Sequence, residues 1–328
     1  MTFARAVALL LFVTAGLAQA QPYKRTQMRG QQVCIYWQVR QYIYQLDSAG
    51  YSKMPLSAVK SAVDSSFLSW QDLSDGCSGF QFIQGTPLSR PSVGYLEGGV
   101  NHNVITFREN SCTSIPQTDL CWNNKSCANV YHCWNHPDAV IALTTATYDI
   151  NTGVILDADI ELNASTPPGG APPYTFTSVS SPVCPDGLPA QNCISTDVQD
   201  TLTHEIGHVL GLAHVVDASS TMFAVAQPGE LTKRIIDPGT ASGFCAIYPS
   251  DNSSSAACDL TAQTNAAITG SGSGTSLSAA GCSTVQGGPG GAALLLGLCV
   301  TLLATARRRL VGLPFTSKAR ESSSRRAI

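Results

Sequence analysis

The sequence predicts an α+β fold for residues 21–250. Segments rich in β-branched and aromatic residues occupy most of the first part of this region, and two segments with clear helix-start signals close it. Strands that mostly precede helices are typical of α+β proteins. With 328 residues, 44% of them hydrophobic, the chain is long enough to bury a sizeable core.

The expected strands are short runs of β-branched and aromatic residues between turn residues. The last two are joined by the turn sequence DINTG at residues 149–153. In chain order, the strands are expected at residues 33–44, 80–83, 93–96, 103–107, 139–148 and 154–163.

An amphipathic helix is expected at residues 56–73, directly after Pro55. Its apolar residues recur at spacings of three and four, which places them on one helical face. These residues are Leu56, Val59, Val63, Phe67 and Trp70.

Two further helices are expected after a Pro-, Gly- and Ser-rich loop at residues 164–194. The first spans residues 197–210, with Thr196 as the N-cap and Gln199 at the capping-box position. The second begins at Asp237 and Pro238, because proline is favoured in the first turn of a helix, and it runs to about residue 248.

The cysteines predict disulfides. Of twelve, Cys282 and Cys299 lie in the C-terminal region, which leaves ten, enough for up to five bridges. Their pairing does not follow from sequence, although the close pairs Cys184 with Cys193 and Cys127 with Cys133 are plausible. A Cys-, Asn- and Trp-rich loop at residues 110–138 is expected to be held by such bridges.

The first twenty residues have the pattern of a secretory signal peptide. Arg5 supplies the positive charge, residues 6–17 form an apolar stretch, and Ala18-Gln19-Ala20 is a small-x-small cleavage site. The alternative is a buried N-terminal helix. Cleavage would start the mature chain near Gln21, outside the cytoplasm, where cysteines pair.

The C-terminal region has the composition of a linker followed by an anchor. Residues 251–281 are rich in Ser, Gly and Thr, as expected of a flexible linker. Residues 292–306 are largely apolar, and Arg307 begins an arginine cluster typical of the cytoplasmic flank of a membrane segment. A basic tail at residues 310–328 ends the chain.

Gly281-Cys282, the short apolar segment and the arginine cluster together resemble the MYXO-CTERM sorting signal of myxobacterial surface proteins. The sorting signal would span residues 282–309. The resemblance implies cleavage beside Cys282 by a sorting peptidase and an exported protein anchored at the cell surface or outer membrane, or released from it. The alternative is a plain single-span membrane anchor.

The charge distribution excludes nucleic acid as a partner. Between residues 21 and 306 the chain carries 11 basic and 21 acidic residues. A nucleic-acid-binding surface needs clustered Lys and Arg to neutralise phosphates, and this region has none.

One stretch of the sequence has the spacing of a metal-binding site with a neighbouring carboxylate. It contains His204, Glu205, His208, Gly211 and His214. Histidines four apart on a helix project from one face and can hold one metal ion. A catalytic zinc takes three protein ligands and leaves a position for water. Gly211 can adopt a left-handed conformation that ends the helix and turns the third histidine back. Glu205 would lie beside the water and take its proton.

This stretch resembles the metzincin signature H-E-x-x-H-x-x-G-x-x-H, and Met222 resembles the Met-turn. Within the metzincins, the His-to-Met spacing resembles the matrixins, over residues 33–250. The resemblance implies one catalytic Zn²⁺ held by the three histidines, with Glu205 as the base that activates the zinc-bound water, and Met222 beneath the metal. It also implies an α+β domain with a twisted mixed β-sheet, an active-site helix and a C-terminal helix. In that domain residues 139–148 would form an edge strand that binds an extended peptide, and residues 223–236 would line a side-chain pocket.

Several other residues are weaker metal candidates. Asp157, Asp159 and Glu161 alternate along one strand and are candidates for Ca²⁺, as in vertebrate matrixins; the alternative is a solvated strand face. His132 and His136 are candidates for a second zinc site together with Cys127 or Cys133; the alternative is that these cysteines form disulfides. His102 is a candidate for a structural zinc, and the alternative is an ordinary loop histidine.

The sequence thus predicts an exported zinc endopeptidase that acts on protein or peptide substrates. Two alternatives remain: a catalytically idle surface module with a structural zinc, and a zinc hydrolase of a non-peptide polymer.

Overall fold

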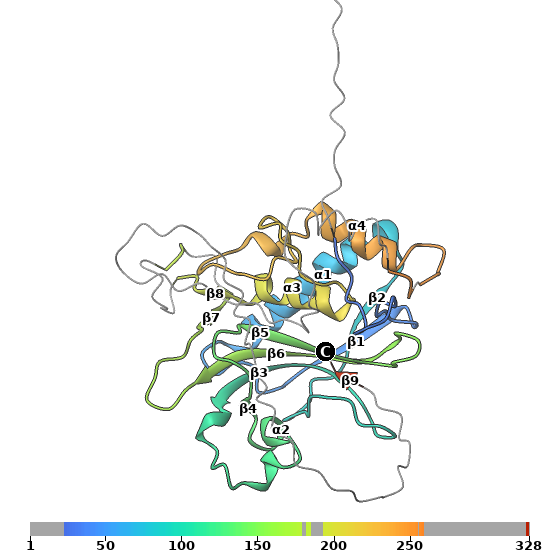
Figure 1. Cartoon of the computed structure of the whole chain (residues 1–328). Helices are drawn as coiled ribbons and strands as arrows, with labels where there is room; N and C mark the ends of the chain where they lie inside the picture. The colour runs from blue at the N-terminus through green and yellow to red at the C-terminus, as the bar shows by residue number, and fades with distance from the viewer. Residues whose placement is uncertain (1–22, 179–181, 185–192, 255, 259–325, 328) are drawn as a thin grey trace, which may run out of the picture.

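The computed structural model describes residues 23–178, 182–184, 193–254, 256–258 and 326–327. A mixed sheet lies at the centre of the molecule, with three helices on one side and a smaller, disulfide-linked module on the other (Figure 1). The α+β class and the mixed sheet predicted from the sequence are confirmed.

The main sheet has the strand order β2-β1-β3-β6-β5-β9, and β4 pairs with β3 outside this order. Neighbours are parallel from β2 to β6, whereas β5 runs antiparallel to β6 and to β9. The strands are β1 (Gln41–Leu46), β2 (Gln81–Gln84), β3 (Asn103–Ser111), β4 (Cys133–Trp134), β5 (Ala142–Tyr148), β6 (Ile155–Thr166) and β9 (Arg326–Ala327). A second, two-stranded sheet joins β7 (Phe176–Thr177) to β8 (Thr196–Asp197).

The three longer helices lie on one side of the main sheet (Figure 1). They are α1 (Leu56–Cys77), α3 (Val198–Val209) and α4 (Pro238–Ile247). The predicted helix after Pro55 is confirmed and extends four residues beyond its expected end. The last helix starts as predicted, with Asp237 as N-cap and Pro238 in the first turn.

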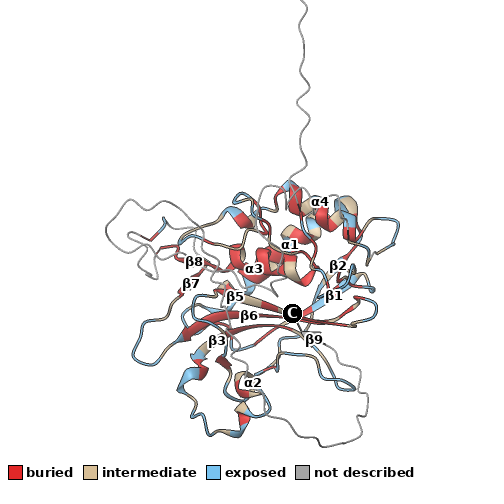
Figure 2. Cartoon of the chain, viewed as in Figure 1, coloured by how far each residue is buried: buried red, intermediate tan, exposed pale blue. Residues whose placement is uncertain are grey.

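The module on the other side of the sheet contains α2 (Cys127–Tyr131), η1 (Cys112–Ser114) and η2 (Leu120–Trp122). It covers the sheet face that the long helices do not, so ten of the twelve residues of β6 are buried. Figure 2 shows this burial along the central strands, with exposed residues in the outer loops.

Aromatic side chains fill the space between the helices and the sheet. Trp70 of α1 is fully buried, and its indole Nε1 donates to the carbonyl of Thr203 in α3 at 3.0 Å. Trp37 donates in the same way to the carbonyl of Val209 at 2.9 Å. Buried indoles need a partner for their N–H group, and here both partners belong to α3. The core therefore fixes α3, the helix that carries the histidine motif.

The ten cysteines expected to pair do form five disulfides. The bridge between Cys184 and Cys193 is confirmed. The plausible pairing of Cys127 with Cys133 is wrong, because β4 lies beside the end of β3 and brings another cysteine to Cys133. The other four bridges are Cys34–Cys258, Cys77–Cys245, Cys112–Cys133 and Cys121–Cys127.

Two strand predictions need correction. The strand expected at residues 33–44 begins only at Gln41, because Val33, Cys34 and Tyr36 form single bridges with three different segments instead of one ladder. Residues 93–96 form no strand, since the amides of Val93 and Gly94 donate to side chains and not to a neighbouring strand.

The N-cap of α3 is Asp197 and not Thr196. The carboxylate of Asp197 accepts from the amide of Asp200 at 2.8 Å. Thr196 is engaged in the short β8 ladder with Phe176.

The signal peptide at residues 1–20, the sorting signal at 282–309 with Cys282 and Cys299, and the linker beyond residue 258 lie outside the described part of the chain. The first residues of the expected linker are not free of the domain, because Ala257 pairs with Val33 and Cys258 is bridged to Cys34. Among the residues that are described, no helix has the length and apolar character needed to span a bilayer.

Candidate metal centre

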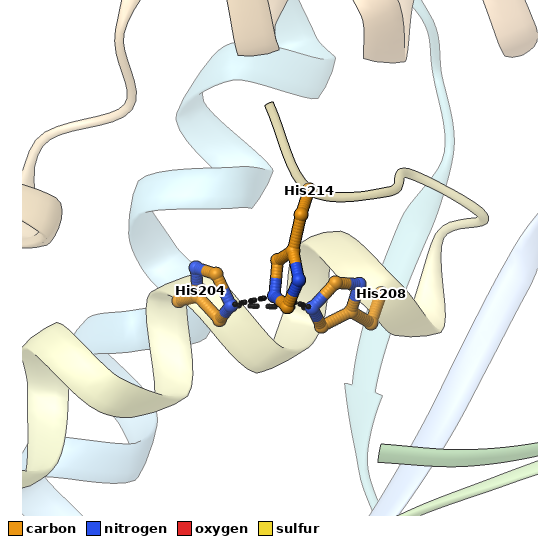
Figure 3. Close-up of side chains that lie close together, drawn as sticks. All are labelled: His204, His208 and His214. Carbon is orange, nitrogen blue, oxygen red and sulfur yellow. Dashed lines mark hydrogen bonds between the residues drawn. The ribbon is translucent and has the colours of Figure 1, made fainter. Parts of the chain in front are cut away.

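Three histidine rings converge on one point. His204 and His208 lie one turn apart on α3, and His214 follows from the turn after the helix, so that the three rings point toward one another (Figure 3). The Nε2 atoms lie 3.2 Å apart for His204 and His208, 3.1 Å for His204 and His214, and 3.0 Å for His208 and His214. Within the described residues, this is the one group of three or more His, Cys, Asp or Glu side chains with metal-binding spacing.

Gly211 makes the turn that returns His214. Its φ is +86°, a left-handed value that favours glycine, and a Cβ there would lie 2.6 Å from the carbonyl oxygen of Ile35. Beyond the turn, the amide of Ala213 donates to the carbonyl of Lys24 at 2.8 Å. The role predicted for this glycine, to end the helix and turn the chain, is confirmed. The contact with Ile35 is a further reason for glycine at this position.

Backbone carbonyls fix the orientation of two of the rings. The Nδ1 atom of His204 lies 2.6 Å from the carbonyl oxygen of Thr221, and that of His208 lies 2.9 Å from the carbonyl oxygen of Leu212. A carbonyl only accepts, so each Nδ1 carries the hydrogen and each Nε2 presents a lone pair. Two lone pairs at 3.2 Å cannot share a hydrogen bond, whereas a cation between them satisfies both.

The donor set fits zinc. Tetrahedral zinc with bonds to nitrogen of about 2.0 Å places its ligand nitrogens roughly 3.3 Å apart, close to the observed separations. Burial lowers the pKa of His208 to about 4 and holds those of His204 and His214 well below the usual value. The rings are therefore neutral at physiological pH, as metal binding requires.

Met222 packs against the helix beneath the histidines. It is 2% exposed, and its Sδ atom lies 2.2 Å from the position that a Cβ would take on Gly207. The amide of Val215 donates to the carbonyl of Met222 at 3.1 Å, which closes a turn between the third histidine and the methionine. Met222 thus lies in a buried turn against α3, and its role as a Met-turn stays a prediction.

Asp237 organises this turn in a way that the sequence did not indicate. Besides capping α4, its Oδ2 atom accepts from the amide of Thr221 at 2.7 Å and from the hydroxyl of Ser220 at 3.0 Å. The same Thr221 supplies the carbonyl that orients His204. Asp237 thus caps α4 and also holds Thr221, whose carbonyl orients the ring of His204.

Glu205 is fully buried beside the histidines. Its Oε2 atom accepts a hydrogen bond from the Thr144 hydroxyl at 2.6 Å, and its Oε1 atom is buried without a partner. Burial raises the pKa of Glu205 to about 8. Thr144 belongs to β5, so the strand next to α3 contributes a residue to the site that sequence reasoning missed. No local sequence signal connects two residues 61 positions apart.

The acidic residues of β6 lie in the interior of the protein and not on a solvated strand face. Asp157, Asp159 and Glu161 are all buried, so the solvated-face alternative is wrong. Asp159 accepts from the amides of Gly94 and Val104 at 2.6 and 2.7 Å. Nothing in these contacts supports calcium, which stays a prediction.

The second-zinc candidates do not come together as a metal site. Cys127 and Cys133 are in disulfides, which confirms the alternative reading of those cysteines. His132 lies 3.1 Å from a carboxylate oxygen of Asp47, and His136 lies 3.6 Å from one of Glu161. His102 belongs to no metal-binding group among the described residues.

Comparison with known families agrees with this geometry. Residues 101–248 match the matrixin family (Peptidase_M10), a span that contains β3 to β6, α3, the three histidines, Met222 and α4. No curated protein sequence matches the chain. Matrixins are zinc peptidases, so the match supports a zinc-dependent metallopeptidase with protein or peptide substrates. Together with the mixed sheet and the histidine triad, it identifies residues 101–248 as a matrixin-like region within an α+β fold of the metzincin type.

Proposed function

We propose that the protein is an exported zinc-dependent endopeptidase, in which His204, His208 and His214 hold the metal and Glu205 is the general base. The observation that carries the proposal is the combination of three neutral, converging Nε2 atoms with a buried carboxylate oxygen that has no partner. Buried polar atoms without partners are rare and concentrate where a ligand or reacting group belongs.

Zinc, when bound, would supply a Lewis acid that polarises the scissile carbonyl and makes a water molecule acidic. The chain's own residues do the rest. The unpaired Oε1 of Glu205 takes a proton from the attacking water as the new C–O bond forms. The same oxygen then gives this proton to the amide nitrogen as the C–N bond breaks.

The substrate is proposed to lie along β5. Residues 142–146 pair with β6 on one side, and among the described residues no strand pairs with them on the other. A peptide can add to such an edge through its backbone. Thr144 lies in the middle of this edge, beside Glu205, so a bound chain extends past the reacting centre in both directions. This arrangement supports cleavage within a chain over removal of terminal residues.

The loop after the Met-turn is proposed to form the pocket for the side chain that follows the cleaved bond. A buried lysine holds this loop: Nζ of Lys233 donates to the carbonyl of Val225 and to Glu230, both at 2.9 Å. Because the ion pair and the carbonyl contact fix this loop, it can form one rigid side of a pocket for a substrate side chain.

Export is supported by the signal-peptide pattern and by the five disulfides, since bridges persist in oxidising compartments. Surface anchoring through the segment after Cys282 rests on the sequence pattern alone. Fractionation of cells that express the wild type and Cys282→Ala tests it: the wild type is expected with the outer envelope, and the same distribution for both chains would contradict a role for Cys282.

The peptidase activity is tested with the full chain and Glu205→Gln, which keeps the shape and removes the base. We expect one zinc per chain in both proteins and cleavage of denatured casein by the wild type alone, blocked by a chelator. Zinc in both without cleavage by either would favour the idle surface module, and a screen on glycans would then test the non-peptide hydrolase. A wild type that binds no zinc would overturn the site itself.

A further inference from the structure

The Thr144 hydroxyl is the single described partner of the Glu205 carboxylate. It lies 2.6 Å from Oε2 and 3.1 Å from the backbone oxygen of Glu205, and Thr144 is 4% exposed. The backbone of Thr144 is fixed in the ladder opposite Ile160. A hydroxyl on a buried residue of a paired strand is held in place, because close packing restricts its side chain and the ladder fixes its backbone.

A hydroxyl has one hydrogen to donate, and two acceptors compete for it here. The side-chain oxygen Oε2 is the closer of the two, at 2.6 Å against 3.1 Å for the backbone oxygen, so the shorter hydrogen bond is the one to Oε2. This leaves Oε1, buried and without a partner, as the oxygen available to the substrate side. The two oxygens of Glu205 therefore differ in their surroundings before any ligand arrives.

Thr144 engages Oε2 whether or not Glu205 carries a proton, because a hydroxyl can both donate and accept. When Oε2 carries no hydrogen, the hydroxyl donates to it at 2.6 Å. When Oε2 carries a proton, the hydroxyl oxygen accepts it, and the hydroxyl hydrogen turns to the backbone oxygen of Glu205 at 3.1 Å. In each case Thr144 holds Oε2 and makes no bond to Oε1.

We propose that Thr144 is a positioning residue that holds Oε2 of Glu205 and so leaves Oε1 directed toward the reacting water. The inference rests on the proposed peptidase function and adds the residue that orients its base. In the reaction, the proton leaves water for Oε1 and then passes from Oε1 to the amide nitrogen, while the O–H bond of Thr144 stays intact throughout.

The test uses zinc-loaded full chain as wild type, Thr144→Val and Thr144→Ser. Valine keeps the shape and removes the hydroxyl, whereas serine keeps the hydroxyl. Thr177→Val is the matched control, because Thr177 is also buried on a strand and its hydroxyl has no hydrogen-bond partner. Zinc content of all four proteins shows whether the site is intact.

For cleavage of fluorescein-labelled casein, Thr144→Val is expected to lower the apparent kcat by about tenfold to a hundredfold with little change in KM. Thr144→Ser is expected to stay within about threefold of the wild type, as is Thr177→Val. A merely structural role for Thr144 would change zinc content or KM, and would not be rescued by serine.

A second readout is independent of turnover. Acetohydroxamate binds zinc through two oxygens and shares a proton with a neighbouring carboxylate, and calorimetry measures its affinity directly. We expect the affinity to fall in Thr144→Val and in Glu205→Gln, and to return in Thr144→Ser. If Thr144→Val keeps both kcat and acetohydroxamate affinity within twofold, the inference is wrong. If the wild type and Glu205→Gln cleave casein equally, the proposed function fails, while calorimetry still decides the role of Thr144.

Discussion

Arg108 and Glu161 form a buried ion pair, with the Nε atom of Arg108 2.6 Å from an oxygen of Glu161. The side chains are 0% and 5% exposed. Arg108 also lies 3.1 Å from Nδ1 of His132, whose Nε2 reaches Asp47. Although burial opposes ionisation, His136 and Arg108 hold the pKa of Glu161 below its usual value. This network joins the disulfide-linked module to β3 and β6.

Replacing Arg108 by alanine is therefore expected to destabilise the protein strongly. The substitution leaves Glu161 charged and buried without its partner, which costs about 3–5 kcal/mol. Urea unfolding measures the loss. Lys60→Ala is the control, because Lys60 pairs with Asp64 on the surface and such pairs contribute at most about 1 kcal/mol. Equal effects of the two substitutions would contradict the structural role of the buried pair.

Gly207 is expected to tolerate no side chain. A Cβ there would lie 2.2 Å from Sδ of Met222, so Gly207→Ala would push the methionine out of place and cost about 1–3 kcal/mol. Gly76→Ala is the matched change in another helix, where a Cβ meets nothing within 4 Å. Alanine is the better helix former, so Gly76→Ala is expected to be neutral or stabilising by up to about 1 kcal/mol. Thermal unfolding of both variants checks the contrast.

Asp200 is expected to make stability fall as pH rises. Burial raises its pKa from 3.8 to about 7, so the folded chain keeps this proton over a range in which the unfolded chain has lost it. The unfolded state then binds fewer protons, and the free energy of unfolding decreases with pH between about 4 and 7.

Asp200→Asn removes this contribution and keeps an acceptor for the amide of Lys233, to which Asp200 is bonded at 2.8 Å. The free energy of unfolding of the Asp200→Asn variant, relative to that of the wild type, is expected to rise from pH 4 to 7 and then to level off. Urea unfolding with a chelator present measures the difference without a contribution from metal. A difference that stays constant with pH would show that the carboxyl titrates normally.

Zinc is expected to stabilise the folded chain. The unfolded chain does not hold the three histidines together, so binding to the folded state alone raises the melting temperature. His208→Ala removes one of three converging nitrogens and is expected to abolish the shift. His102→Ala, outside any metal-binding group of the described residues, should leave it intact. Equal shifts in the two variants would place the stabilising metal elsewhere.

Local sequence was enough to predict the centre of the site. The histidine spacing, the turn at Gly211 and the later methionine all lie within nineteen residues, 204–222, where helix geometry and glycine conformation decide the outcome. The same holds for α1 and α4, whose start signals at Pro55 and Asp237 are adjacent to the helices they begin.

Contacts between distant segments were beyond such reasoning. The partner of Glu205 is Thr144 because β5 lies against α3, which no spacing along the chain indicates. Cys127 pairs with Cys121, and not with Cys133, because β4 carries Cys133 to the end of β3. The alternating acidic residues of β6 are buried and not solvated, because other segments of the chain cover them: Asp159 accepts from Gly94 and Val104, and Glu161 pairs with Arg108.

The bridge between Cys34 and Cys258 spans 224 positions, and Arg25 adds a hydrogen bond of 2.6 Å to the carbonyl of Ala257. If the chain beyond Cys258 is pulled, the covalent bond passes the tension straight to Cys34. The bridge thus gives the tension a covalent route that bypasses the backbone of α3 and of the three histidines, which lies between the two cysteines. In the surface-anchored protein that we propose, a pull on the anchor would reach the domain at Cys34 and not through the end of α4.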